Sequence, residues 1–246
     1  MFAAFAERIS RLSPGTPSTE ELKPFLLEET DRAQIYYAPL DWVNKSAKII
    51  VVGITPGRAT MLKAFQVASL CLREGRSWDE ALKRAKQVAS FSNARSAIGT
   101  MFDELGIPEV LGLSRSADLF ESKQGLLHPT SCVRYPVFVR HRNSCELTNY
   151  TGHSPRLLDW ETSRRYIKNL LGPELQEIPD ALVVPCGVAV DSALRHLVDL
   201  KAIEPTRCLF GFPHPSGANG HRLTHFAKRR DELKQMVIRW AEQLAP

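Results

Sequence analysis

The chain has 246 residues, of which 43% are hydrophobic and 24% are charged, and its formal net charge is +5 at pH 7. This composition excludes a disordered chain, since it provides enough apolar surface for a folded core. The sequence contains no apolar run long enough to span a membrane, and charged residues follow the N-terminus too early for a secretory signal. We therefore expect a cytoplasmic globular protein whose positive charge mildly favours a polyanionic partner.

The cysteines are scattered along the chain, and no two of them form a Cys-x-x-Cys pair. They are Cys71, Cys132, Cys145, Cys186 and Cys208. This spacing argues against a disulfide framework, a zinc site and an iron–sulfur cluster. We expect buried free thiols, no metal or other cofactor, and no association with membranes.

The N-terminal part of the chain is predicted to be helical. Apolar residues recur at helical spacing from Phe2 to Leu12, and a Pro- and Gly-containing segment then separates them from a second helix that begins near Ser18. We expect residues 1–45 to form a helical extension packed on a core domain of residues 46–246.

The core domain begins with an apolar, β-branched run at residues 48–52, which is typical of a strand buried on both faces of a parallel sheet. A turn, Gly53-Ile54-Thr55-Pro56-Gly57-Arg58, leads from this strand into a helix. Such a turn can present backbone N–H groups to a ligand at the carboxyl end of the sheet. The turn lacks the Lys-Ser/Thr ending of a phosphate loop and the three glycines of a dinucleotide fingerprint, so a nucleotide-binding enzyme is the weaker alternative.

Helices and apolar strands alternate along the rest of the chain. Helices are expected around residues 78–88, 98–105, 190–200 and 226–240, and further strands at residues 125–133, 181–184 and 208–212. This alternation predicts a three-layer α/β/α sandwich with a central four-stranded parallel sheet.

The last predicted strand opens into the loop Gly211-Phe212-Pro213-His214-Pro215-Ser216-Gly217-Ala218-Asn219. The two prolines fix the backbone and end the strand, so they hold His214 stiffly at its end. The tip of the loop carries little bulk, which allows a close approach to a large partner.

The order and spacing of these motifs resemble those of the uracil-DNA glycosylase superfamily. Besides the turn at residues 53–57 and the loop at residues 214–219, the similarity includes Phe91-Ser92, the strand from Leu126 to Arg134, Gly187, and His225 to Lys228, and it covers roughly residues 48–240. It implies a uracil-DNA glycosylase-like fold and a cofactor-free enzyme that flips a nucleotide out of DNA and hydrolyses its base–sugar bond.

The resemblance also implies a role for each matching residue. His214 would donate to the charge growing on the departing base, and Thr55 stands at the position that handles the water. The base pocket would contain Ile54, Gly57, Phe91 and His128. DNA would be bound by Gly53, Pro56, Arg58, Pro215, Ser216, Gly217, Ala218, Asn219, Arg222 and Lys228.

Three departures from the family pattern concern the substrate and the water. Thr55 replaces an Asp or Asn, and a threonine hydroxyl is not a useful base near pH 7. His128 replaces the Asn that reads uracil, and Gly57 replaces a bulky residue, so the pocket has room for a 5-substituent. We therefore expect a monofunctional glycosylase for uracil or a 5-modified pyrimidine, acting in base-excision repair or in defence against modified phage DNA. A DNA-binding protein of this fold with impaired catalysis is the first alternative to this function, ahead of the nucleotide-binding enzyme.

Overall fold

The structure is a computed structural model that describes residues 2–13, 15–140, 146–217 and 220–244. The chain forms two compact units, each assembled from three segments. Unit 1 consists of Met1–Val43, Thr55–Ser92 and Val133–Ser154, and unit 2 of Asn44–Ile54, Asn93–Cys132 and Pro155–Pro246.

Unit 1 is built on an antiparallel sheet in the strand order β1-β2-β5-β6. Its strands are β1 (Leu26–Glu29), β2 (Ala33–Tyr36), β5 (Val137–Arg140) and β6 (Leu147–Asn149), and its helices are α1 (Phe2–Ser10), α2 (Thr19–Leu22), the 3-10 turn η1 (Lys23–Phe25), α3 (Arg58–Arg73) and α4 (Trp78–Ala89).

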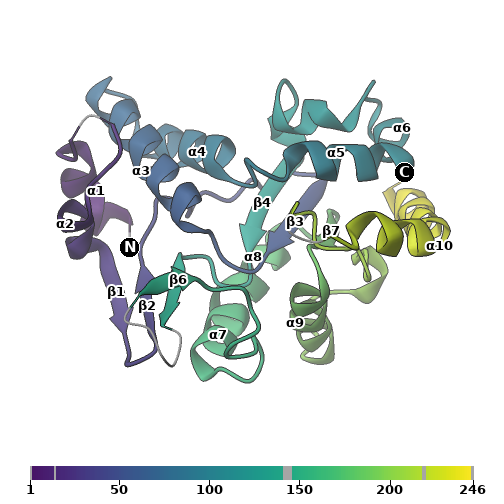
Figure 1. Cartoon of the computed structure of the whole chain (residues 1–246). Coiled ribbons are helices and arrows are strands. Elements are labelled where there is room, and N and C mark those ends of the chain that lie inside the picture. Colours follow the sequence, from purple (N-terminus) through teal and green to yellow (C-terminus); the bar gives the residue numbers. More distant parts are fainter. Residues whose placement is uncertain (1, 14, 141–145, 218–219, 245–246) are drawn as a thin grey trace. The chain divides into compact units, whose positions relative to one another are not determined.

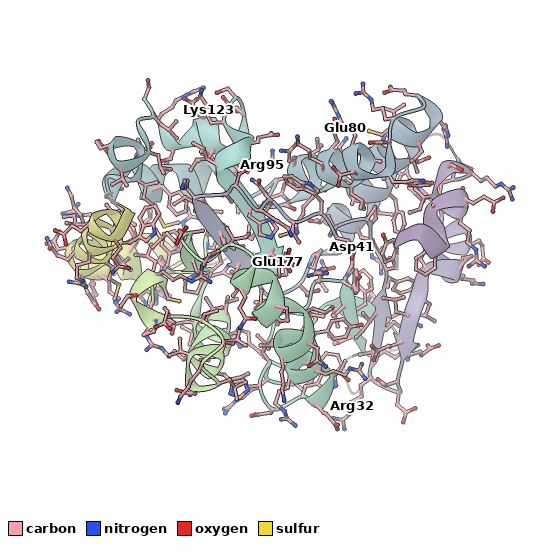
Figure 2. The ribbon with its side chains drawn as sticks, turned by 180° about the vertical axis from the view of Figure 1, so that it is seen from behind. Arg32, Asp41, Glu80, Arg95, Lys123 and Glu177 are labelled. Carbon is pink, nitrogen blue, oxygen red and sulfur yellow. The ribbon has the colours of Figure 1, made fainter. Side chains whose placement is uncertain are left out.

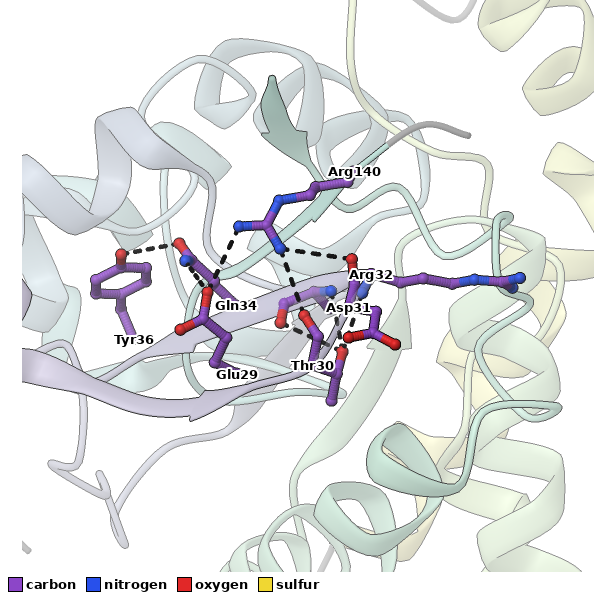
Figure 3. A network of polar contacts seen from close by, with 8 residues as sticks. Glu29, Thr30, Asp31, Arg32, Gln34, Tyr36 and Arg140 are labelled. Atoms are coloured by element: carbon purple, nitrogen blue, oxygen red, sulfur yellow. Dashed lines mark hydrogen bonds and ion pairs between the residues drawn. The ribbon is translucent and has the colours of Figure 1, made fainter. Parts of the chain in front are cut away.

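Local chemistry accounts for two features of unit 1. The helix α2 begins with a capping box, in which Ser18 and Glu21 exchange side-chain-to-backbone hydrogen bonds. The turn between β1 and β2 is held by polar contacts, in which the Thr30 hydroxyl accepts from Ala33 N–H at 3.0 Å and the Arg140 guanidinium donates to the Thr30 and Asp31 carbonyls at 3.4 Å each (Figure 3). These contacts fix where the first two strands reverse direction.

Unit 2 is built on a parallel sheet in the strand order β4-β3-β7, flanked by helices of the same unit (Figure 1). Its strands are β3 (Ile49–Gly53), β4 (Leu127–Ser131) and β7 (Leu182–Pro185), and its helices and turns are α5 (Arg95–Glu104), α6 (Ile107–Leu111), η2 (Ser116–Phe120), η3 (Gln124–Leu126), α7 (Glu161–Tyr166), the π-helix η4 (Ile167–Leu171), α8 (Gly172–Gln176), α9 (Val188–Asp199), η5 (Pro205–Arg207) and α10 (Arg222–Leu244).

The central strand β3 is buried along its whole length, as its apolar sequence predicts. Val52 lies opposite Thr130 of β4 and Pro185 of β7, so the three strands end at the same edge of the sheet. Four described cysteines are buried free thiols, as expected, and burial raises the pKa of Cys208 to about 12. Cys145 lies outside the described residues. Among the described residues, no helix is long and apolar enough to cross a membrane.

The prediction of an α/β fold with a parallel sheet is confirmed, but the predicted fourth strand is wrong. In the described part of the chain, residues 208–212 contribute one parallel bridge, between Cys208 and Val183. The turn η5 ends directly before Cys208, Gly211 has a φ of 89°, and Pro213 has no N–H to donate. The segment therefore cannot extend a ladder of hydrogen bonds.

The description of residues 1–45 as a helical extension is also incomplete. The helices α1 and α2 are present, but β1 and β2 follow them and join β5 in the antiparallel sheet. These strands have only four residues each, and β1 is partly exposed along its length, so no apolar run marks it in the sequence.

Candidate functional site

The loop that carries His214 is fastened to the carboxyl end of the parallel sheet in unit 2. Leu209 N–H donates to the Val183 carbonyl at 2.8 Å, and Gly187 N–H donates to the Phe212 carbonyl at 3.1 Å. Phe212 is buried, and its ring lies against Phe102 and Phe226 at centroid distances of 5.8 and 6.3 Å. The residue before Pro213 is thus anchored in the core, which restrains the chain just before His214.

The backbone after His214 determines its tautomer. Ser216 N–H donates to Nδ1 of His214 at 3.3 Å, so Nδ1 is the unprotonated nitrogen of the neutral ring. The neutral imidazole therefore carries its proton on Nε2, which is a hydrogen-bond donor. A donor on a rigid loop can stabilise negative charge on a bound group.

Gly187 makes room for His214. Its φ is 92°, and a Cβ built there would lie 2.9 Å from the His214 Cβ and 3.3 Å from its Cδ2. Both the backbone conformation and this close approach require glycine. Gly187 lies two residues after the end of β7.

The structure gives His128 a role that differs from the predicted one. The side chain is fully buried, its Nδ1 accepts from Asn44 N–H at 3.3 Å, and its Nε2 lies 2.7 Å from Glu174 Oε1. Since both ring nitrogens are engaged within unit 2, neither can read a base, and the assignment of His128 to the base pocket is corrected. The Asn44 amide also donates to the Gly125 and Leu127 carbonyls at 2.8 and 3.0 Å, which fixes the start of β4.

Another polar group on β4 was not singled out from the sequence. Thr130 is 6% exposed, and its hydroxyl has no partner among the described residues. It lies one residue before the end of β4, near the edge where ligands bind in parallel sheets. A buried hydroxyl without a partner needs a water or a ligand atom to offset its desolvation.

In unit 1, the hydroxyl of Thr55 is committed to the fold. It donates to the Tyr135 carbonyl at 2.8 Å and accepts from Val137 N–H at 3.2 Å. Its single proton and one lone pair are therefore used to connect the turn after β3 to the start of β5. Thr55 can at most accept a hydrogen bond from a water, so it is not the group that activates one.

The turn at Gly57 meets a side chain that the sequence analysis missed. Asn149 Oδ1 accepts from Arg58 N–H at 2.9 Å and so caps the first turn of α3. A Cβ at Gly57 would lie 3.5 Å from Asn149 Nδ2. Gly57 therefore faces Asn149, at an ordinary van der Waals distance for an added Cβ.

The chain is similar in sequence to a bacterial protein, and the similarity covers almost the whole length of both chains. No protein-family model matches it. The uncharacterized protein YoxB of Bacillus subtilis (strain 168) is 33% identical over 241 residues, which cover 96% of this chain and 92% of YoxB. The chain belongs to the YoxB family. Among solved structures, the crystal structure of wild-type Pedobacter heparinus SMUG2 superposes with a TM-score of 0.45 at 11% identity, covering 95% of this chain and 98% of that one.

In this YoxB-family protein, the predicted site residues are divided between the units. Unit 2 contains Gly53, Ile54, His128, Arg222, Lys228 and the loop around His214, and unit 1 contains Thr55, Pro56, Gly57, Arg58 and Phe91. Ala218 and Asn219 lie outside the described residues. Gly53 and Pro56 are buried, so they offer no side-chain surface to DNA.

The other side chains predicted to contact DNA differ in their surroundings within the protein. Arg222 donates to the Pro215 carbonyl at 2.8 Å and thereby supports the His214 loop. The Arg58 guanidinium lies over the Phe138 ring at 4.6 Å, and Lys228 is exposed on α10. Phe91 is half-buried with a φ of 53°, a conformation that is costly for a bulky residue and that concentrates at functional sites.

The cap on α3 gives a first prediction for this YoxB-family chain. Asn149→Ala should lower the free energy of unfolding by about 1 kcal/mol, since it removes the acceptor for Arg58 N–H. Asn149→Asp keeps an acceptor oxygen and adds a charge that suits a helix N-terminus, so it should be at least as stable as the wild type. Thermal unfolding of the three proteins measures both effects. An alanine variant as stable as the wild type would contradict the capping role.

Proposed function

We propose that this protein is a monofunctional DNA glycosylase that excises uracil or a 5-modified pyrimidine and leaves an abasic site. The observation that carries the proposal is the tautomer of His214, because a neutral ring with its proton on Nε2 can donate to the oxygen of a departing base. The resemblance of the motifs at residues 53–57 and 214–219 to the uracil-DNA glycosylase superfamily supplies the substrate class.

The anchoring of the chain just before His214 supports the same reaction. Breaking the base–sugar bond requires a nucleotide that is out of the stack and a donor that is already in place when charge develops. The Gly187–Phe212 hydrogen bond restrains the backbone before His214, and the Ser216 N–H contacts Nδ1 of its ring. Phe91 is our candidate for stacking on the flipped base, and Lys228, Arg58 and the backbone of Ser216 and Gly217 are candidates for contacts with the flanking phosphates.

A second function, DNA binding without catalysis, is favoured by one observation. The Thr55 hydroxyl is engaged by Tyr135 and Val137, so the position that handles the water in related enzymes holds no base. If no other group replaces it, the protein would bind a flipped nucleotide and leave the bond intact.

Mass spectrometry of released bases separates the two functions. The protein is incubated with duplexes that contain uracil, 5-hydroxymethylcytosine or its glucosylated form, and with an unmodified duplex of the same sequence as the control. We expect release of at least one of these bases, with one abasic site formed for each base released. DNA binding without any base release would refute the glycosylase and support the second function.

A further inference from the structure

An aspartate in the first turn of α9 holds the backbone that leads to His214, and both residues belong to unit 2. Asp191 Oδ2 accepts a hydrogen bond from Gly211 N–H at 2.5 Å. Its Oδ1 lies 2.6 Å from Arg195 Nε, one turn further along the same helix, and the Asp191 side chain is only 13% exposed. Both carboxylate oxygens are therefore engaged, one by the backbone before His214 and the other by an arginine.

A side chain of α10 packs against the same glycine. The φ of Gly211 is 89°, a backbone conformation that favours glycine. A Cβ built at this position would overlap Nη1 and Cζ of Arg229, so the guanidinium occupies the space of the missing side chain. Glu232 accepts from Arg229 Nε at 3.1 Å and from its Nη2 at 2.8 Å, which orients the guanidinium. Gly211 is thus held by a hydrogen bond to Asp191 and by packing against Arg229.

The connection from this glycine to the histidine is short and restrained. Phe212 and Pro213 alone separate Gly211 from His214. The Phe212 carbonyl accepts from Gly187 N–H at 3.1 Å, and the ring of Pro213 fixes its own φ. A displacement of Gly211 is therefore transmitted along the chain to the imidazole.

We propose that Asp191 is a positioning residue for His214, whose hydrogen bond to Gly211 sets where the imidazole lies relative to the departing base; this rests on the glycosylase function proposed above. A carboxylate suits this role, because a charged acceptor forms a shorter and stronger hydrogen bond with a backbone N–H than a neutral one does. Arg195 orients the carboxylate in turn, and its guanidinium lies over the Phe210 ring at 4.1 Å. Exact placement matters, since a misplacement of about 1 Å can lower a rate about 10²-fold.

The test is a double-mutant cycle between Asp191 and His214. Asp191→Ala should lower the single-turnover rate of base release about 10-fold, while its affinity for DNA containing an abasic site changes less than about twofold. In the His214→Ala background, the same substitution should lower the rate no further, because a positioning residue acts through the ring that it positions. A merely structural role of Asp191 would lower the rate by the same factor in both backgrounds.

Two further variants of α9 serve as controls. Asp191→Asn keeps an oxygen that can accept from Gly211 N–H, so it should recover most of the rate that Asp191→Ala loses. Asp199→Ala removes an exposed carboxylate at the end of the same helix and should release base at the wild-type rate. Melting temperatures of all the variants show that the rates are compared between folded proteins.

The results that contradict the proposal are distinct from one another. A folded Asp191→Ala variant with the wild-type rate, or equal losses in the two backgrounds, refutes the positioning role and leaves the glycosylase function standing. A wild-type protein that binds DNA and releases no base refutes the glycosylase function and this role together. Should Asp191→Ala fail to fold, Asp191→Glu keeps the charge and displaces the acceptor, and equal losses in the two backgrounds for that variant also refute the role.

Discussion

Replacing His214 with alanine is expected to lower the single-turnover rate of base release by about 10² to 10³-fold, the usual loss for one donor to a developing anion. Affinity for DNA should change little, because the ring stabilises charge that appears only during bond breaking. His214→Gln should lose less, since its amide can place a donor near the position of Nε2. Single-turnover kinetics and titration with abasic DNA measure the two quantities separately.

A matched control and a contrary result complete this test. His153→Ala removes an exposed histidine of unit 1 and should leave the rate unchanged. If His214→Ala lowers the rate and the DNA affinity by the same factor, the ring stabilises the bound substrate and the transition state equally. His214 would then be a binding residue. If His214→Ala releases base at the wild-type rate, His214 is not the donor to the departing base, and the proposed function loses its main support.

The sequence predicts the elements that carry strong apolar patterns. The sequence predicts β3 within one residue, and it predicts the turn and the helix that follow, because the continuous β-branched run and the Gly57 break are local signals. The break in the chain at Pro213 and Pro215 is equally visible in the sequence, because proline restricts the backbone wherever it occurs. The fourth strand was overpredicted, since an apolar segment buried in the core has the same composition whether or not it forms a ladder.

The contacts that define the site could not be predicted in the same way. Asn149 caps α3 from 91 residues away, and Asp191 accepts from Gly211 across 20 residues, so no short motif contains either pair. His128 is an error of the opposite kind, a predicted site residue that belongs to the core. Its position in the motif suggests a base-reading role, but its ring nitrogens contact Asn44 and Glu174 instead. A motif in the sequence can predict where a strand ends. It cannot predict which groups a side chain contacts, because those contacts depend on the tertiary fold.

The buried pair of His128 and Glu174 leads to the second large expected effect, on stability. Since Nδ1 of His128 accepts from Asn44 N–H, the neutral ring carries its proton on Nε2 and donates it to Glu174 Oε1. Glu174→Ala leaves this donor buried without its acceptor and opens a cavity. We expect the free energy of unfolding to fall by about 3 kcal/mol. For a chain of this size, that lowers the melting temperature by about 6 to 12 °C.

Two further variants show whether the acceptor or the charge of Glu174 stabilises unit 2. Glu174→Gln keeps an oxygen that can accept from Nε2, so it should lose much less stability than the alanine variant. Glu177→Ala removes an exposed carboxylate one residue beyond the end of α8, and because its ion pair with Lys45 is solvated, its loss should be no more than about 1 kcal/mol (Figure 2). If Glu174→Gln is as unstable as Glu174→Ala, the charge itself is required. A required charge would mean that His128 is protonated at both ring nitrogens. Nδ1 could then not accept from Asn44 N–H, so the tautomer assigned to His128 would be wrong.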